Sequence, residues 1–325
     1  MVDIPEPFCV ICQENFTGNE NYHQVTCCGK VFHRNCLDTW ALTNIPNAPP
    51  CPFCRNDIHT VYSGVWNGPE SYSLLLACRK GHTNTVQMFV SAGSELNIQD
   101  AYGKSALTFS IDQSHIDIAK TLIDAGAELN IQDSCGETAL MRAIDREPTD
   151  IAKTLIEAGA DLNIQDGYGS TALTQASMTG RTNMAQILID AKADLNIQDE
   201  DRNTALAWSI YREGHTDIAK ILIDAKADLN IQYKNGETAL ILAIERERTD
   251  IAKTLIEAKA DVHIEYEGGN CALIKAIHKE NTDIVKTLID AGAVLNIQND
   301  LAFSALMEAY QKNLTEIVQI FYNVD

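Results

Sequence analysis

The sequence has few aromatic residues, no excess of basic residues and no long apolar segment. Phe, Trp and Tyr together make up 6% of the 325 residues. The net charge is −20 at pH 7, which opposes binding to nucleic-acid phosphates and to anionic membrane surfaces. No run approaches the roughly 18 apolar residues that a membrane helix needs. We therefore expect neither a nucleic-acid-binding protein nor a membrane protein.

The N-terminus lacks the basic start and apolar stretch of a secretory signal, so we expect no secretion. Cysteine is unevenly distributed, because seven of the ten lie before residue 55. The other three, Cys78, Cys135 and Cys271, are scattered. In a reducing compartment a cluster of cysteines indicates zinc rather than disulfides. We therefore expect the protein in the cytoplasm or the nucleus.

Eight potential metal ligands lie between residues 9 and 54. In chain order they are Cys9, Cys12, Cys27, Cys28, His33, Cys36, Cys51 and Cys54. Thiolate and imidazole are the ligands that Zn²⁺ prefers, and ligand pairs two residues apart suit tetrahedral structural sites. Eight ligands fill two such sites and leave no position for water, so we predict two structural zinc ions. Because so short a segment buries little apolar surface, zinc must supply much of its folding energy.

The spacing of these ligands resembles the RING finger of ubiquitin ligases. The resemblance implies that Cys9, Cys12, His33 and Cys36 hold one zinc ion and that Cys27, Cys28, Cys51 and Cys54 hold the other. It also implies that Ile11, Trp40 and Pro52 form the apolar groove that binds a ubiquitin-conjugating enzyme. Arg55 stands where RING ligases place an arginine that hydrogen-bonds both this enzyme and its attached ubiquitin. A planar guanidinium with five fixed donors suits that role.

One position departs from the RING pattern. The common Cys-Gly-His provides its fourth ligand where this chain has Lys30, and a lysine ammonium cannot ligate zinc. The second site must therefore recruit Cys27 as well as Cys28, or another group such as His23. A PHD finger has the same order of ligand types, but it normally has a Trp where this chain has Pro49. We therefore favour a RING finger.

After residue 66 the sequence repeats with a period of about 33 residues. The triplet Asn-Ile-Gln begins at Asn97, Asn130, Asn163, Asn196, Asn230 and Asn296. One step, between Asn196 and Asn230, is 34 residues long, which places an inserted residue between Leu206 and His215. Self-similarity at such a period indicates a solenoid of stacked units.

Each unit has the same internal pattern. A turn centred on Gly precedes Thr-Ala-Leu, where the Thr can cap the helix that follows. After a short break, apolar residues at helical spacing, such as Ile151, Leu155 and Ile156, predict a second helix. These units resemble the ankyrin repeat, whose Thr-Pro-Leu-His appears here as Thr-Ala-Leu-x. We count eight units, with degenerate first and last copies.

The resemblances together imply a small zinc-stabilised α+β RING domain joined to an all-α ankyrin-repeat solenoid. The boundaries predicted are 1–58 for the RING domain, 59–66 for a linker and 67–325 for the repeats. Three second helices end at Lys192, Lys226 or Lys259 where Gly is usual, so we expect a left-handed conformation and slightly weaker junctions there. Cys78 occupies the register of Ile144 and Ile210, which predicts a core position.

The repeats contain no nucleophile beside a base and no glycine loop for phosphate, so they offer a binding surface rather than a reaction. Positions that vary between units lie at the turn tips and on the first helices, and Trp, Tyr and Arg dominate binding hot spots. The substrate-binding candidates are Tyr102, Tyr168, Arg202, Trp208, Tyr211, Arg212, Arg246 and Lys275.

Two functions are compatible with this organisation. In the first, a ubiquitin ligase recruits a ubiquitin-conjugating enzyme charged with ubiquitin through the RING, and holds a protein substrate on the repeats. In the second, a non-enzymatic adaptor uses the zinc domain as a structural module, and the departure at Lys30 keeps this alternative open. An enzyme with a Cys–His nucleophilic pair is excluded, because His33 and the cysteines near it are needed for metal.

Overall fold

The computed structural model describes residues 70–144, 149–295 and 305–322, together with three strands closer to the N-terminus. Within these ranges the side chains are described from residue 74 onward. The chain divides into two compact units, Met1–Ser134 and Cys135–Asp325.

The three strands form a small antiparallel sheet in the first unit. β1 (Tyr22–Val25) lies between β2 (Val31–His33) and β3 (Val61–Ser63). In the register, His23 of β1 lies opposite Phe32 on one side and Ser63 on the other. β3 falls within the segment predicted to be a linker. The α+β form of the zinc domain and its boundaries stay predictions, because most residues around these strands lie outside the described ranges.

Pairs of short helices make up the rest of the described chain. In the first unit they are α2 (Glu70–Lys80), α3 (Thr83–Ser91), α4 (Ala106–Asp112) and α5 (Ile116–Asp124). In the second unit they are α6 (Ala139–Ile144), α7 (Asp150–Glu157), α8 (Ala172–Thr179), α9 (Thr182–Asp190), α10 (Ala205–Tyr211), α11 (Thr216–Asp224), α12 (Ala239–Glu245), α13 (Thr249–Glu257), α14 (Ala272–His278), α15 (Thr282–Asp290), α16 (Ala305–Gln311) and α17 (Thr315–Tyr322). None of the helices in these ranges is both long and apolar enough to span a lipid bilayer.

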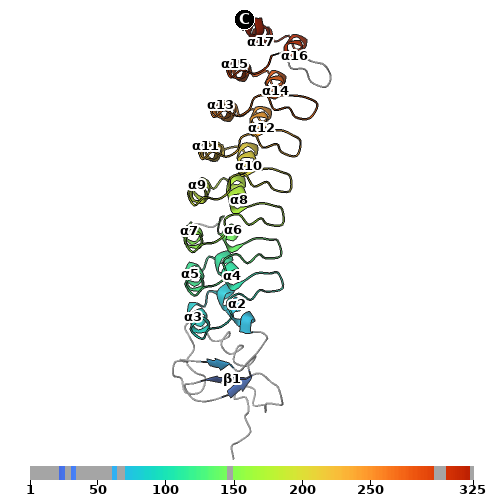
Figure 1. Cartoon of the computed structure of the whole chain (residues 1–325). Coiled ribbons are helices and arrows are strands. Elements are labelled where there is room, and N and C mark those ends of the chain that lie inside the picture. Colours follow the sequence, from blue (N-terminus) through green and yellow to red (C-terminus); the bar gives the residue numbers. More distant parts are fainter. Residues whose placement is uncertain are drawn as a thin grey trace, which may run out of the picture. The chain divides into compact units, whose positions relative to one another are not determined.

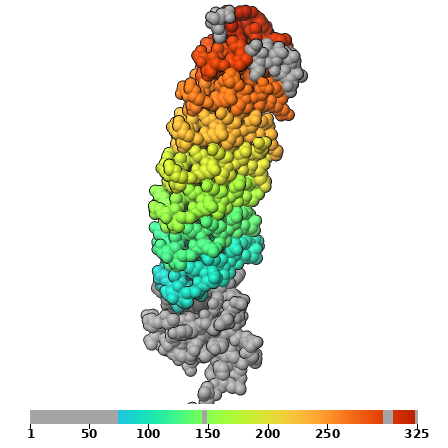
Figure 2. All heavy atoms as spheres, in the orientation of Figure 1, coloured from blue at the N-terminus to red at the C-terminus, as the bar shows by residue number. Residues whose placement is uncertain are grey.

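The helices of the second unit are arranged in two rows. In Figure 1 the first helices, from α6 to α16, form one row and the second helices, from α7 to α17, form the other. The loops project on the side of the first row. In the space-filling view of Figure 2, the repeats of this unit follow one another as bands in chain order. This arrangement confirms the predicted helical repeat array.

Polar side chains start the first helix of several repeats. Ser105, Thr171 and Thr204 precede α4, α8 and α10, and each side-chain oxygen accepts a hydrogen bond from the backbone N–H three residues later. These bonds satisfy donors that have no partner within the first helical turn. The capping role predicted for the Thr of Thr-Ala-Leu is therefore confirmed at Thr171 and Thr204.

The second helices close with a left-handed residue. Gly159 has a φ of 91°, and Lys192, Lys226 and Lys259 adopt φ values of 70°, 67° and 69° at the equivalent position. The left-handed lysines predicted from the sequence are confirmed. A residue with a Cβ costs about 1 kcal/mol more than Gly in this conformation.

The Asn-Ile-Gln triplet at residues 163–165 joins its repeat to the next. The amide of Gln165 donates to Gly169 O at 2.7 Å, in its own turn, and to Gln198 O at 3.0 Å, in the following one. Asn163 Oδ1 accepts from the backbone N–H of Asp194 at 2.9 Å. Backbone groups of the loops therefore find partners in the neighbouring repeat, which explains why the triplet recurs at the repeat period.

Two histidines pack over glycines of the preceding repeat. The ring of His215 lies against Gly180, where an added Cβ would stand 2.5 Å from Nε2, and its Nδ1 is 2.9 Å from Ser177 O. His115 covers Gly81 in the same way, with Cε1 2.7 Å from an added Cβ. Both histidine rings therefore have a structural role, because each fills the space over a glycine of the preceding repeat.

The apolar faces of the described helices are buried against one another. In α11, for example, Ile218, Ala219 and Leu222 are at most 1% exposed. Cys78 is completely buried in α2, which confirms its predicted core position. Burial raises the pKa of the Cys78 thiol to about 12, and burial also raises the pKa of Cys271.

A thiol reagent at neutral pH is expected to modify Cys135 but neither Cys78 nor Cys271 in the folded chain. Only Cys135 of these three is exposed, and the thiolate is the reacting species, whose population falls as the pKa rises. Mass spectrometry after alkylation and proteolysis measures each site separately. All three should react in denaturant, and equal rates for Cys78 and Cys135 in the folded chain would contradict the core position of Cys78.

Candidate functional site

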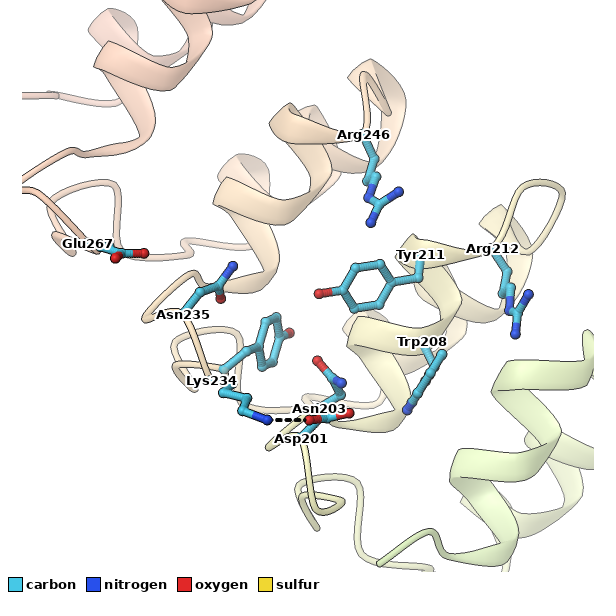
Figure 3. A pocket seen from close by; sticks show the side chains of 10 residues that line it. Asp201, Asn203, Trp208, Tyr211, Arg212, Lys234, Asn235, Arg246 and Glu267 are labelled. Carbon is cyan, nitrogen blue, oxygen red and sulfur yellow. Dashed lines mark hydrogen bonds and ion pairs between the residues drawn. The ribbon is translucent and has the colours of Figure 1, made fainter. Parts of the chain in front are cut away.

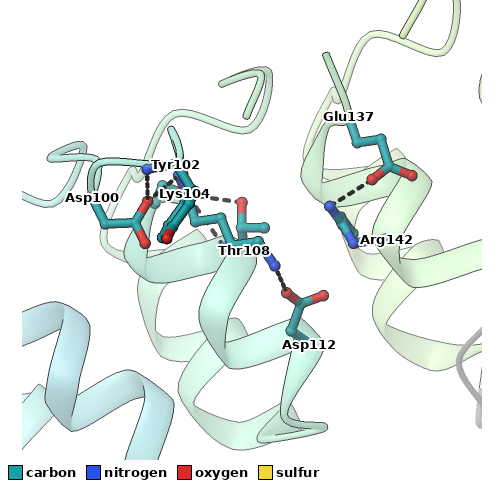
Figure 4. A network of polar contacts seen from close by, with 8 residues as sticks. Asp100, Tyr102, Lys104, Thr108, Asp112, Glu137 and Arg142 are labelled. Atoms are coloured by element: carbon teal, nitrogen blue, oxygen red, sulfur yellow. Dashed lines mark hydrogen bonds and ion pairs between the residues drawn. The ribbon is translucent and has the colours of Figure 1, made fainter. Parts of the chain in front are cut away.

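Aspartates shape the turns that carry the variable side chains. Asp100 Oδ1 accepts hydrogen bonds from the backbone N–H groups of Tyr102 at 2.8 Å and Lys104 at 2.9 Å (Figure 4). Asp166 closes its own turn in the same way. Such local bonds hold a tight turn without help from other elements. The turn-tip side chains therefore project into solvent, and Tyr102 and Tyr168 are 69% and 73% exposed.

The turn of Asp199 also positions an aromatic pair on α10. Asp199 Oδ1 accepts from the backbone N–H groups of Asp201 and Asn203, and its Oδ2 accepts from Trp208 Nε1 at 2.7 Å. This last bond fixes the indole beside the turn. The rings of Trp208 and Tyr211 contact each other with their centroids 5.8 Å apart.

Two arginines lie over this aromatic pair. The guanidinium carbon of Arg212 is 5.8 Å from the centroid of Trp208, and that of Arg246 is 4.8 Å from the centroid of Tyr211. Both distances allow a cation–π interaction. Arg212 follows α10 with an extended backbone, at φ −94° and ψ 128°, in the segment that contains the inserted residue.

These side chains border an open hollow of about 630 Å³, which we call the arginine hollow. It is lined by Asp201, Asn203, Trp208, Tyr211, Arg212, Tyr233, Lys234, Asn235, Arg246 and Glu267. Figure 3 shows the two arginines near the aromatic pair and Glu267 at the opposite end. Tyr233 occupies the position that Asp199 holds in the preceding turn. It is 2% exposed, and burial raises its pKa.

A second hollow of about 430 Å³, the acidic hollow, adjoins the first and shares Asp201 and Trp208 with it. Its lining consists of Cys135, Glu137, Asp166, Tyr168, Ser170, Gln175, Met178, Asp199, Glu200, Asp201 and Trp208. Five of these residues are carboxylates, and none is Lys or Arg. The two hollows therefore differ in charge although they adjoin.

Lys275 is held by its neighbours rather than free at the surface. Its Nζ is 2.8 Å from Glu245 Oε2 and 3.7 Å from Glu237 Oε1, and it lies over the ring of Tyr266 at 5.0 Å. Burial by itself lowers the pKa of Lys275, but hydrogen bonds to Glu245 and Tyr266 outweigh it and raise the pKa. The side chain is therefore tied into an ion pair.

The structure brings together some of the predicted substrate-binding residues and not others. Trp208, Tyr211, Arg212 and Arg246 line the arginine hollow, and Tyr168 lines the acidic hollow. Arg202 and Lys275 line neither, and Tyr102 belongs to the first unit. Sequence reasoning missed Asn203 and Tyr233, although the change from Asp to Tyr at position 233 was a visible signal. A role in substrate binding stays a prediction for each candidate.

The predicted zinc ligands and the residues around them lie outside the described side chains. These are Cys9, Ile11, Cys12, Cys27, Cys28, Cys36, Trp40, Cys51, Pro52, Cys54 and Arg55. Only the backbone is described for His33, at the end of β2. Among the residues whose side chains are described, no group of three His, Cys, Asp or Glu could hold a metal ion. The donor set of seven cysteines and one histidine nevertheless fits zinc chemically.

Comparison with known families finds two matches. The family described as ankyrin repeats (3 copies) matches residues 74–166, 140–233, 191–266 and 212–299. The family described as Ring finger domain matches residues 7–55. RING fingers bind zinc, so the second match supports a zinc-binding segment before the repeats.

The curated relatives resemble this chain over a short segment. E3 ubiquitin-protein ligase RHA1B of Arabidopsis thaliana is 40% identical over 52 residues, which are 16% of this chain and 32% of the relative. RING-H2 finger protein ATL56 of the same plant is 42% identical over 15% of this chain and 25% of its own length. E3 ubiquitin-protein ligase RNF133 of Macaca fascicularis is 36% identical over 21% of this chain and 18% of its own length. The matched segments thus span about a third or less of these relatives.

Proposed function

Because this chain belongs to the ankyrin-repeat family and carries a RING finger before its repeats, we propose that it is a RING-type ubiquitin ligase. The observation that carries the proposal is the match of residues 7–55 to the RING finger, together with 40% identity to a curated ubiquitin ligase over 52 residues. The repeats hold a protein substrate, and the RING recruits a conjugating enzyme charged with ubiquitin.

The reaction needs no covalent intermediate on this chain. The amine of a substrate lysine attacks the thioester carbon between the conjugating enzyme and ubiquitin, an isopeptide bond forms, and the enzyme's thiolate leaves. The ligase holds both reactants in one complex and thereby supplies proximity and orientation. Ile11, Trp40 and Pro52 form the apolar contact with the conjugating enzyme. Arg55 hydrogen-bonds the enzyme and the attached ubiquitin, so that the thioester is held in one orientation.

Two structural zinc ions hold the RING together in this proposal. Cys9, Cys12, His33 and Cys36 bind one ion, and Cys27, Cys28, Cys51 and Cys54 bind the other. The ions supply folding energy rather than a Lewis acid, because no ligand position remains for water or substrate. Thiolate ligands also require a reducing environment, which favours the cytoplasm or the nucleus.

Purified chain, ubiquitin, activating enzyme and a panel of conjugating enzymes are expected to build ubiquitin conjugates. Ile11→Ala and Arg55→Ala should each lower the initial rate by about tenfold or more, because each removes a contact worth about 1.4 kcal/mol or more in the reactive complex. Immunoblotting over time measures the rate, and zinc analysis shows whether the variants are folded. Arg79→Ala, on an exposed residue of α2, is the control with the same change of charge.

An adaptor without ligase activity is the second candidate, and Lys30 at a ligand position favours it. If the panel gives no conjugates while the chain binds two zinc ions, the ligase proposal fails and the adaptor replaces it. Unchanged rates in both Ile11→Ala and Arg55→Ala would show that conjugation, if present, does not use the RING surface.

A further inference from the structure

The arginine hollow concentrates uncommitted positive charge on an acidic protein. The chain as a whole carries a net charge of −20. Nearby lysines form ion pairs, Lys234 with Asp201 at 2.8 Å and Lys275 with Glu245 at 2.8 Å. Among the described residues, by contrast, neither Arg212 nor Arg246 pairs with a carboxylate. Each guanidinium carbon lies within cation–π distance of an aromatic ring, which helps to hold the group in place and leaves N–H donors available to a ligand.

An asparagine side chain also lines this hollow. Asn203 is 7% exposed, and its side chain forms no hydrogen bond with any residue in the described ranges. Figure 3 shows the amide pointing toward Tyr211 inside the hollow. The polar atoms of this amide remain accessible to water, which a ligand can displace. Its oxygen and its NH₂ group together complement the N–H and C=O groups of an extended peptide.

We propose that the arginine hollow binds an extended peptide segment of a protein partner, with an Asp or Glu side chain of that segment held between Arg212 and Arg246. Asn203 pairs with the peptide backbone next to this acidic residue, and Tyr211 and Trp208 contact its apolar neighbours. The inference rests on the proposed function in so far as the peptide belongs to the ubiquitination substrate.

The acidic hollow determines which type of residue the bound peptide carries near its acidic residue. Its five carboxylates would repel a polyanion such as RNA, which therefore does not fit the combined surface. A Lys or Arg of the peptide fits there instead, against Trp208 and Tyr168. Equivalent points on neighbouring repeats are about 10 Å apart, because packed helices lie about 8–10 Å from each other. An extended peptide advances about 3.3 Å per residue. The basic residue therefore lies about three positions from the acidic one.

A library of random octapeptides that includes phosphoserine, screened on the immobilised full-length chain, tests this assignment. We expect enrichment of peptides with Asp or Glu about three residues from Lys or Arg. One enriched peptide, labelled with fluorescein, then gives dissociation constants by anisotropy. Arg212→Ala and Arg246→Ala should each weaken binding about tenfold and erase the acidic preference, because each removes a charge-assisted hydrogen bond.

Matched variants distinguish the contribution of each hollow to peptide binding from the effect of a changed net charge. Glu200→Ala, in the acidic hollow, should relax the preference for the basic residue and keep the acidic one. Arg79→Ala removes one positive charge, as Arg212→Ala and Arg246→Ala do, but lies far along the sequence from both hollows and should leave the dissociation constant unchanged. Circular dichroism checks that each variant is folded. Arg212→Lys should recover part of the peptide affinity that Arg212→Ala loses.

Three results would overturn the inference. These are the absence of any enriched charge pattern, an acidic preference that survives both arginine substitutions, and selection of phosphoserine in place of Asp and Glu. The measurement does not depend on ligase activity, because peptide binding should be the same in Arg55→Ala. A chain that binds the peptides but makes no conjugates would therefore refute the proposed function alone, whereas an active ligase without peptide preference would refute only this inference.

Discussion

Replacing Cys51 with serine is expected to remove one zinc ion from each chain and to abolish ubiquitin conjugation. In the proposed RING, Cys51 supplies a thiolate to the second zinc ion, and a serine hydroxyl is a much weaker ligand. Structural zinc in small domains contributes about 10 kcal/mol or more of folding energy, which a short segment with little apolar core cannot replace. The surface for the conjugating enzyme is therefore lost with the metal. Mass spectrometry under native conditions measures the zinc content.

The same substitution should leave the repeats folded. Each repeat contacts only its neighbours in a solenoid, so loss of the zinc domain does not propagate along the array. Far-ultraviolet circular dichroism should therefore keep most of its helical signal. Cys135→Ser is the matched control for zinc, because Cys135 is an exposed cysteine of the repeats and its replacement should leave the zinc content unchanged. Full activity of Cys51→Ser with two zinc ions bound would refute the ligand assignment.

The departure at Lys30 can be resolved in the same assay. If Cys27 completes the second site, Cys27→Ser lowers the zinc content, and adding Lys30→His restores it by supplying the imidazole of the common pattern. If His23 is the ligand, Cys27→Ser has no effect on the zinc content. The sequence leaves these alternatives open because both residues stand close to Cys28.

Gly169→Ala is expected to destabilise the second unit by about 3 kcal/mol, which is more than an ordinary substitution in a turn costs. Gly169 has a φ of 76°, where any residue with a Cβ is strained. An added Cβ would also stand 2.9 Å from the backbone nitrogen of Glu200, in the next turn. Backbone cannot move aside as a flexible side chain does, so the two turns must separate. The midpoint of urea unfolding, followed by circular dichroism, measures the loss.

Gly159→Ala is the matched control for this prediction. Gly159 has a φ of 91°, yet an added Cβ there meets nothing within 4 Å. Gly159→Ala should therefore lower the free energy of unfolding only by the conformational strain, about 1 kcal/mol. Equal losses for both variants would show that the approach of neighbouring turns at Gly169 contributes nothing. Because Tyr168 and Glu200 line the acidic hollow, Gly169→Ala should also weaken peptide binding, whereas Gly159→Ala should not.

Repetition in the sequence was sufficient to predict the repeat fold and many of its details. The period placed the turns, the two helices of each unit, the buried position of Cys78 and the left-handed lysines such as Lys226. These features follow from local rules, since a residue in a solenoid meets the same kind of neighbour in every repeat. Ligand spacing in the same way predicted the RING match at residues 7–55.

The tertiary structure alone decided which variable residues meet. Sequence reasoning grouped Lys275 with Arg212 and Arg246 as surface candidates, but Lys275 is tied to Glu245, whereas the two arginines lie over aromatic rings. It also gave no reason to choose Asn203, whose amide matters only because it lines the hollow. The physical reason is that a repeat period specifies the positions of backbones. The partners of a variable side chain depend on the side chains of adjacent repeats, about 33 residues away in the sequence.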